Sequence, residues 1–170
     1  FPDDYIGKRD RLIVEIFYST GVRLSELINI KIKDIDFSKK QLKVLGKRNK
    51  ERIIPLTQEL VISLEKFLEI RNSIKTKFNS YLLLTEKGRK LNSSLVYKTM
   101  NKLISSVTSL KKTSPHVLRH TFATHMLNSG ADLNIIKELL GHASLSATEV
   151  YTHNSIEKLK KVFNNAHPRA

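Results

Sequence analysis

The chain has 170 residues, of which 40% are hydrophobic, and this composition suits one globular domain spanning residues 1–170 and excludes a disordered chain. It contains no cysteine and no apolar run near the roughly 18 residues that cross a bilayer, which excludes disulfides, thiolate catalysis and a membrane span and favours a cytoplasmic location. The net charge of +14 favours a polyanionic partner, with nucleic acid preferred only modestly over a membrane surface.

The first half of the chain is expected to form three helices and a β-hairpin. Apolar residues at helical spacing predict a helix that ends near Gly21, and a short helix over 24–31 follows. Two apolar or alternating segments, 41–45 and 52–56, flank a basic turn that contains glycine, and we expect them to pair as a hairpin. Thr57 then caps a long amphipathic helix.

The second half is expected to be mainly helical. Residues 81–84 are interpreted as a third strand, and Ser93 opens the next helix. Ser114 and Pro115 mark a helix start, with Gly130 at its end. Inward-facing residues are predicted for the helix that Ser93 opens, for the helix that Asp132 caps and for the last helix: Val96, Met100, Leu103, Ile104, Leu133, Ile136, Leu139, Leu140, Ile156, Leu159 and Phe163.

The C-terminal third carries repeated helix-start signals. Asp132 is expected to cap a helix that closes at Gly141. The spacing in 146–149 fits a capping box that starts a short helix carrying Tyr151, and 154–157 repeats that spacing at the start of a last amphipathic helix.

The positive charge is concentrated in residues 39–52. Seven basic side chains occur there against the single acid Glu51, and they are Lys39, Lys40, Lys43, Lys47, Arg48, Lys50 and Arg52. This cluster fits a contact with a polyanion, and a merely solvated lysine-rich surface is the alternative. The hairpin places Lys47 at its tip.

A small set of basic residues and one tyrosine has the chemistry to cut a phosphodiester without a metal. Arg23 and Arg119 can hold the two non-bridging oxygens, because a guanidinium donates paired hydrogen bonds and stays charged. Tyr151 can attack the phosphorus, and His116 can act as its base or hydrogen-bond partner. Lys47 can protonate the leaving sugar oxygen. A further phosphate donor is His142.

Each of these residues also has an ordinary structural explanation. A tyrosine on an amphipathic helix usually belongs to the core, and a lysine on a turn is usually solvated. His116 and His120 lie four residues apart and allow a zinc interpretation, which the lack of cysteine and of an interposed glutamate disfavours. We assign His120 and His125 to packing and hydrogen bonding. Glu26 and Asp34 are either orienting partners of Arg23 or surface charges.

Taken together, the ordered set resembles the catalytic set of the tyrosine recombinases, the integrase family of site-specific DNA recombinases, and most of all its Xer-type members. The segments that carry the resemblance are 20–27, 46–52, 116–125, 139–142 and 151–153, so it covers essentially the whole chain. The resemblance implies that Arg23, Lys47, His116, Arg119, His142 and Tyr151 are catalytic.

The resemblance also implies a fold and a mechanism. We expect a mainly α (α+β) catalytic domain with a small three-stranded antiparallel sheet, while the N-terminal core-binding domain of the family is absent from this chain. Cleavage of double-stranded DNA would give a 3′-phosphotyrosyl intermediate and then strand exchange, with no cofactor and no metal. The partners would be DNA and a homo- or hetero-tetramer, in which the C-terminal helix docks in trans or folds back in cis. A type IB topoisomerase and a catalytically idle DNA-binding module are the alternatives.

Overall fold

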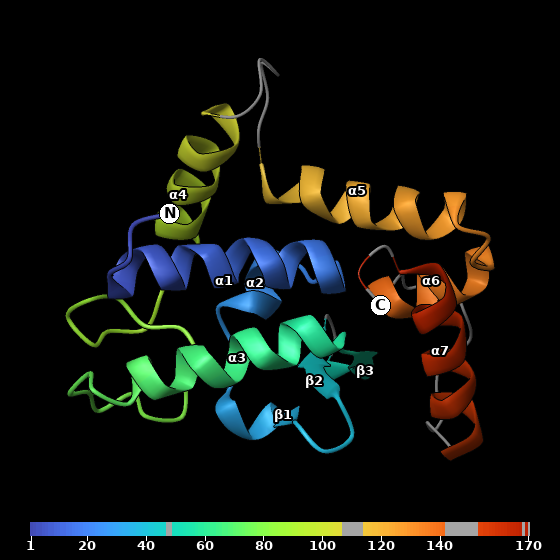
Figure 1. Cartoon of the computed structure of the whole chain (residues 1–170), viewed down its shortest axis with the longest axis horizontal. Coiled ribbons are helices and arrows are strands. Elements are labelled where there is room, and N and C mark those ends of the chain that lie inside the picture. The colour runs from blue at the N-terminus through green and yellow to red at the C-terminus, as the bar shows by residue number, and fades with distance from the viewer. Residues whose placement is uncertain (47–48, 107–113, 142–152, 168, 170) are drawn as a thin grey trace.

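Helix α1 (Tyr5–Thr20) runs through the middle of the fold, between α5 (Pro115–Asn128) on one side and α3 (Gln58–Arg71) on the other (Figure 1). The Asp4 carboxylate caps its first turn by accepting from the backbone N–H of Gly7 at 2.7 Å. The helix ends at Gly21, as predicted, because that residue adopts a left-handed conformation at φ 61°. Its fully buried apolar residues are Leu12, Ile13, Ile16 and Phe17.

The computed structural model describes residues 1–46, 49–106, 114–141, 153–167 and 169. Within these ranges the chain is mainly helical with one small antiparallel sheet, which confirms the expected fold class. None of the helices in the described part is long and apolar enough to cross a membrane.

The sheet has the strand order β1-β2-β3 and contains the predicted hairpin. Strands β2 (Gln41–Leu45) and β3 (Glu51–Pro55) pair antiparallel, with Val44 opposite Arg52. The third strand is β1 (Ile35–Asp36), which pairs with β2. This register places the side chains of Val44 and Arg52 on the same face of the sheet, where both are buried.

The prediction that residues 81–84 form a third strand is wrong. This segment makes two isolated bridges, from Tyr81 to Lys31 and from Leu84 to Lys90, and joins no ladder. Leu82, Leu83 and Leu84 are all at most 1% exposed, so the apolar run is enclosed on both sides instead of lying on a sheet with one wet face.

The second helix is shorter than expected because the segment after it pairs with the residues around Tyr81. Helix α2 spans only Leu24–Leu27, and the 3-10 turn η1 (Ile32–Asp34) follows. Two backbone hydrogen bonds form this pairing. The N–H of Leu82 donates to the carbonyl of Ile30, and the N–H of Ile32 donates to the carbonyl of Ser80. These long-range bonds compete with continuation of the helix.

The caps of the next two helices lie close to the predicted positions. Thr57 Oγ1 accepts from Leu60 N–H at the start of α3. Helix α4 (Ser93–Ser105) is capped by the side chain of Asn92 and buries Val96 and Met100. Leu103 and Ile104, also expected inside, are only partly buried.

The C-terminal helices close one end of the fold. Helix α6 spans Leu133–Leu140, and α7 spans His153–Ala166 and contacts α5 and β3 (Figure 1). On α6 the expectation for Leu133 is wrong, because the first turn projects from the core and leaves this side chain 52% exposed. On α7, Leu159 and Phe163 are buried against their own chain and Ile156 is half-buried. The helix expected from the 146–149 spacing lies outside the described residues.

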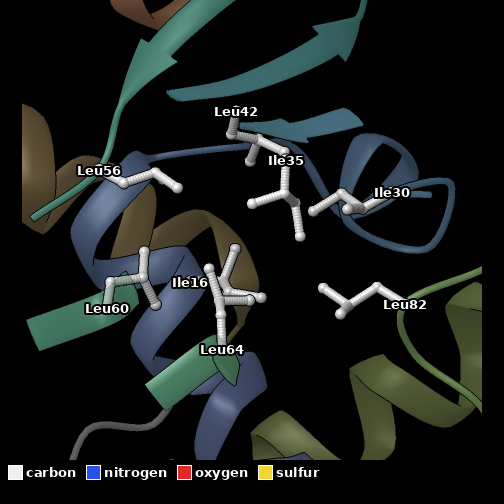
Figure 2. A pocket seen from close by; sticks show the side chains of 8 residues that line it. All are labelled: Ile16, Ile30, Ile35, Leu42, Leu56, Leu60, Leu64 and Leu82. Carbon is white, nitrogen blue, oxygen red and sulfur yellow. The ribbon is translucent and has the colours of Figure 1, made fainter. Parts of the chain in front are cut away.

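The core between α1, α3 and the sheet is apolar throughout. A cavity of about 10 Å³ remains where eight aliphatic side chains meet (Figure 2). The lining is Ile16, Ile30, Ile35, Leu42, Leu56, Leu60, Leu64 and Leu82. A void of this size with no polar lining atom cannot hold a water molecule stably, so it is a packing gap and not a ligand site.

Candidate active site

Arg23 stands between two helix ends. It lies two residues after Gly21, which ends α1, and immediately before α2, and its side chain is 25% exposed. Its Nη1 donates to Glu26 Oε1 at 2.9 Å and its Nη2 donates to the Gly141 carbonyl at 2.8 Å. A guanidinium has five N–H donors, so these bonds leave three for a ligand, as far as the described residues show.

Glu26 is the partner that orients Arg23. The residue is 4% exposed, and its Oε2 also accepts from the Arg23 backbone N–H at 2.7 Å. Burial acts to raise the pKa of Glu26, but hydrogen bonds and positive charge from Arg52, and then from Arg23, outweigh it and hold the pKa below its usual value. Asp34, the other candidate, accepts from Lys31 N–H and takes no part here.

Arg119 approaches the same place from α5. Its Nη1 donates to the Gly21 carbonyl, and its Nη2 donates to the Leu140 carbonyl at 2.7 Å. Burial, followed by the charges of Arg23 and Arg52, lowers the pKa of Arg119 to about 10. The group is still a cation at neutral pH, and its pKa is depressed mainly because the side chain is buried and secondarily because two other guanidinium groups lie nearby.

The C-terminal end of α6 organises these arginines. Three consecutive carbonyls, those of Leu139, Leu140 and Gly141, accept from Arg52 Nε, Arg119 Nη2 and Arg23 Nη2 at 2.7, 2.7 and 2.8 Å. The last carbonyls of a helix lack partners within it and carry partial negative charge, so they suit guanidinium donors. Gly141 ends the helix at φ 66° in the left-handed conformation.

Arg52 belongs to this group, although the sequence places it in the basic cluster of 39–52. It is 5% exposed and donates through Nη1 and Nη2 to the two oxygens of Glu26 at 2.6 and 2.9 Å. The alternation of β3 carried the signal, because Arg52 lies two residues before buried Ile54 and therefore on the same face. The cluster prediction is wrong for this one residue.

The remaining predicted residues fall into two groups. His116 lies on the first turn of α5, three residues before Arg119, and is exposed. Lys47, His142 and Tyr151 lie outside the described residues, although the described chain reaches Gly46 and Gly141 directly before two of them.

His120 and His125, the other two histidines of α5, differ in their surroundings. His120 is exposed, so the packing role expected for it is wrong. His125 Nδ1 lies 3.2 Å from the hydroxyl of Tyr18, which confirms its hydrogen-bonding role. In the part of the chain that the structure describes, no three His, Asp or Glu side chains converge as metal ligands.

Arg23 and Arg52 therefore pair with the Glu26 carboxylate, and Arg119 binds the same helix end, where α6 and strand β3 of the hairpin meet (Figure 1). Three guanidinium groups against one carboxylate leave an excess of positive charge, and Arg23 and Arg119 each keep N–H donors that have no partner in the described part of the chain. Such an arrangement binds an anion with planar or tetrahedral oxygens, above all a phosphate.

The sequence matches the model of the phage integrase family over residues 2–158. The chain belongs to this family. Among its relatives, the tyrosine recombinase XerC of Staphylococcus carnosus is 47% identical over 168 residues, which cover 99% of this chain and 57% of the relative. XerC of Pelotomaculum thermopropionicum is 43% identical over 171 residues, covering 97% and 56%. The chain thus spans little more than half the length of these family members.

Solved structures of other family members share the fold. The crystal structure of XerA recombinase matches with a TM-score of 0.74 and 33% identity, covering 100% of this chain and 64% of that one. XerH bound to difH substrate in a pre-cleavage complex matches with a TM-score of 0.76 and 30% identity, covering 95% and 47%. These similarities confirm the resemblance to Xer-type tyrosine recombinases.

Proposed function

We propose that residues 1–170 form the catalytic domain of a site-specific recombinase that cleaves and rejoins double-stranded DNA. The observation that carries the proposal is the convergence of Arg23 and Arg119 on the end of α6, where guanidinium N–H groups remain without a partner among the described residues. The relatives are tyrosine recombinases by name, and XerH was solved bound to difH substrates in a pre-cleavage and a post-cleavage complex. Because the substrate would be intracellular DNA, we infer a cytoplasmic location.

The two arginines would hold the scissile phosphate. As an oxygen nucleophile adds to phosphorus, negative charge grows on the non-bridging oxygens, and fixed guanidinium donors stabilise that charge more than they stabilise the ground state. Arg23 and Arg119 are already held by backbone carbonyls, so little rearrangement is needed when the charge develops.

The other four residues would move protons and complete the phosphate contacts. The Tyr151 oxygen attacks phosphorus and loses its proton to His116 or to solvent, and the bond from phosphorus to the 5′-oxygen breaks. Lys47 gives that oxygen a proton, which leaves a 3′-phosphotyrosyl link and a free 5′-hydroxyl. His142, directly after Gly141, donates to the phosphate. Attack by the 5′-hydroxyl of a partner strand reverses these steps and joins the strands, with no cofactor required.

Replacement of Tyr151 by phenylalanine tests this proposal. In the intact protein, the Tyr151→Phe variant should bind DNA as the wild type does but form no denaturant-resistant adduct on a nicked substrate that traps the cleaved state. Tyr97→Phe is a suitable control, because Tyr97 is an exposed tyrosine of α4. An adduct that persists in the Tyr151 variant would reject the assignment. A wild type that binds DNA without any adduct would favour the idle binding module, and relaxed but unrecombined products would favour a topoisomerase.

The role of Lys47 has its own test. Lys47→Ala should cleave ordinary DNA much more slowly, because the leaving alkoxide is a poor leaving group without a proton. A substrate with sulfur at the bridging 5′ position releases a thiolate that needs no proton, so most of the rate should return on it. Equal defects on both substrates would assign Lys47 to phosphate binding instead.

We further propose that the active assembly is a tetramer on DNA, of one or two kinds of subunit, in which α7 docks on a neighbour. In this structure Leu159 and Phe163 of α7 are buried in the core of their own chain. Docking in trans therefore requires each subunit to release its own α7 from the site that receives the neighbour's helix. In the intact protein, truncation after residue 154 should then impair synapsis more than binding to a single site. A truncated protein that assembles and recombines at the wild-type rate would exclude the exchange.

A further inference from the structure

Arg52 lies on β3 and links this strand to two helices, α2 and α6. From β3 it donates through Nη1 and Nη2 to both oxygens of Glu26 on α2, and through Nε to the Leu139 carbonyl on α6. It also touches the turn after α6, since a Cβ added to Gly141 would lie 3.0 Å from Arg52 Nη1. At 5% exposure it cannot reach a substrate itself.

We propose that Arg52 is a positioning residue for the phosphate chemistry, and this inference rests on the proposed recombinase function. Glu26 Oε1 is shared by Arg23 Nη1 and Arg52 Nη1, at 2.9 and 2.6 Å. Arg52 thereby fixes the carboxylate that directs Arg23, and through Leu139 it fixes the helix end whose carbonyls hold Arg23 and Arg119.

Charge gives Arg52 a second effect on Arg23. With Arg52 present, the Glu26 carboxylate is neutralised from inside the fold, and the charge of Arg23 remains available to an external anion. Without Arg52, the carboxylate would keep Arg23 as its one ion-pair partner among the described residues, and it would both draw that guanidinium inward and cancel its charge. A lysine could restore the charge but not the planar fork or the bond from Nε to Leu139.

The chain provides a matched control for a buried arginine. Arg9 on α1 is 4% exposed, donates through Nε and Nη2 to the Asp10 carboxylate, and donates through Nη1 to the Leu84 carbonyl. It has the same kinds of partner as Arg52 but no bond to the arginine cluster. The general effect of losing a buried, paired arginine can therefore be measured at Arg9.

The test compares Arg52→Met, Arg52→Lys and Arg9→Met in the intact protein. Adduct formation is timed on an ordinary phosphodiester and on a methylphosphonate, in which a methyl group replaces one non-bridging oxygen and removes the charge. Arg52→Met should bind DNA with near wild-type affinity yet form adduct about 100-fold more slowly, the loss typical of misplacing an active-site group by about 1 Å. This defect should shrink on the neutral methylphosphonate, and Arg52→Lys should recover part of the rate.

Arg9→Met should lower the melting temperature by a similar amount and leave the cleavage rate near wild type. Equal cleavage by the Arg52 and Arg9 variants, or an Arg52 defect of the same size on both substrates, would overturn the positioning role. If Arg52→Met does not fold, Arg52→Lys decides the question by the same comparison of substrates. A wild type that forms no adduct would instead refute the proposed function, so the two failures are distinct.

Discussion

Gly21 is the position where one methyl group should disturb both the fold and the site. It ends α1 in the left-handed conformation, and its carbonyl accepts from Arg119 Nη1. A Cβ at this position would lie 2.6 Å from Phe122 Cδ1 and 2.8 Å from Leu140 Cδ2, both closer than carbon atoms pack. Gly21→Ala therefore combines backbone strain with a collision against α5 and α6.

The magnitude follows from separating these two effects. A left-handed alanine costs about 1–2 kcal/mol, and overpacking a filled interior costs about 1–3 kcal/mol more. The variant should therefore lose about 2–5 kcal/mol of unfolding free energy. Gly130 is the control, because it is also left-handed at φ 85° but no described atom lies within 4 Å of its added Cβ. Gly130→Ala should lose only the backbone contribution of about 1–2 kcal/mol.

Urea denaturation followed by circular dichroism measures both losses, and the difference between the variants isolates the collision. Adduct formation in the intact protein gives a second readout, which should fall for Gly21→Ala alone because its carbonyl holds Arg119. Equal destabilisation by the two substitutions would refute the packing argument, and an unchanged cleavage rate in Gly21→Ala would refute the link to Arg119.

Three further outcomes are expected. Glu26→Gln should lose about 3–5 kcal/mol of unfolding free energy by urea denaturation, since it leaves the Arg52 charge uncompensated. Because folding lowers the pKa of Glu26 from its ordinary value of 4.5, this loss should be full above pH 4.5 and shrink at more acid pH. Burial lowers the pKa of His167 from 6.5 to about 4, so the native state should lose stability as pH falls from 6.5 toward 4, and a thermal-melting series should show a flatter profile for His167→Phe. Replacing the three lysines of residues 39–43 by glutamine should make the plot of log affinity for DNA against log salt concentration less steep, by about one unit of slope for each phosphate that is no longer neutralised. Fluorescence-anisotropy titrations measure this slope, and an unchanged value would show that these lysines do not contact DNA.

Local signals predicted most of the helices and the hairpin. The left-handed glycines at 21 and 141, and the side-chain caps at Thr57 and Asp132, depend on a few neighbouring residues, and all four were found where the sequence placed them. The length of α2 and the strand assigned to 81–84 depended on pairing between segments some 50 residues apart, which periodicity does not report. Leu133 was misplaced because an apolar residue in a first helical turn can project beyond the core.

The candidate site also combines features that the sequence predicts with features that depend on the fold. Arg23 and Arg119 were identified from the type and order of residues, and the fold brings them to the same helix end. Their acceptors are backbone carbonyls, which every residue possesses, so no sequence pattern could name them. The charge of Arg52 indicates an exposed side chain, whereas its position in the alternating strand β3, two residues before Ile54, indicates the burial that the structure shows.

The carbonyls at the end of α6 have a consequence for which changes this helix can tolerate. The three arginines bind main-chain atoms of consecutive residues, so exchanging one aliphatic side chain of α6 for another leaves the acceptors in place. Inserting or deleting a single residue is different, because each residue turns an α-helix by about 100° and advances it by about 1.5 Å. Such a change would point the acceptors away from all three guanidinium groups at once. We therefore expect homologous sequences to vary in the composition of α6 while keeping its number of residues between Asp132 and Gly141 constant.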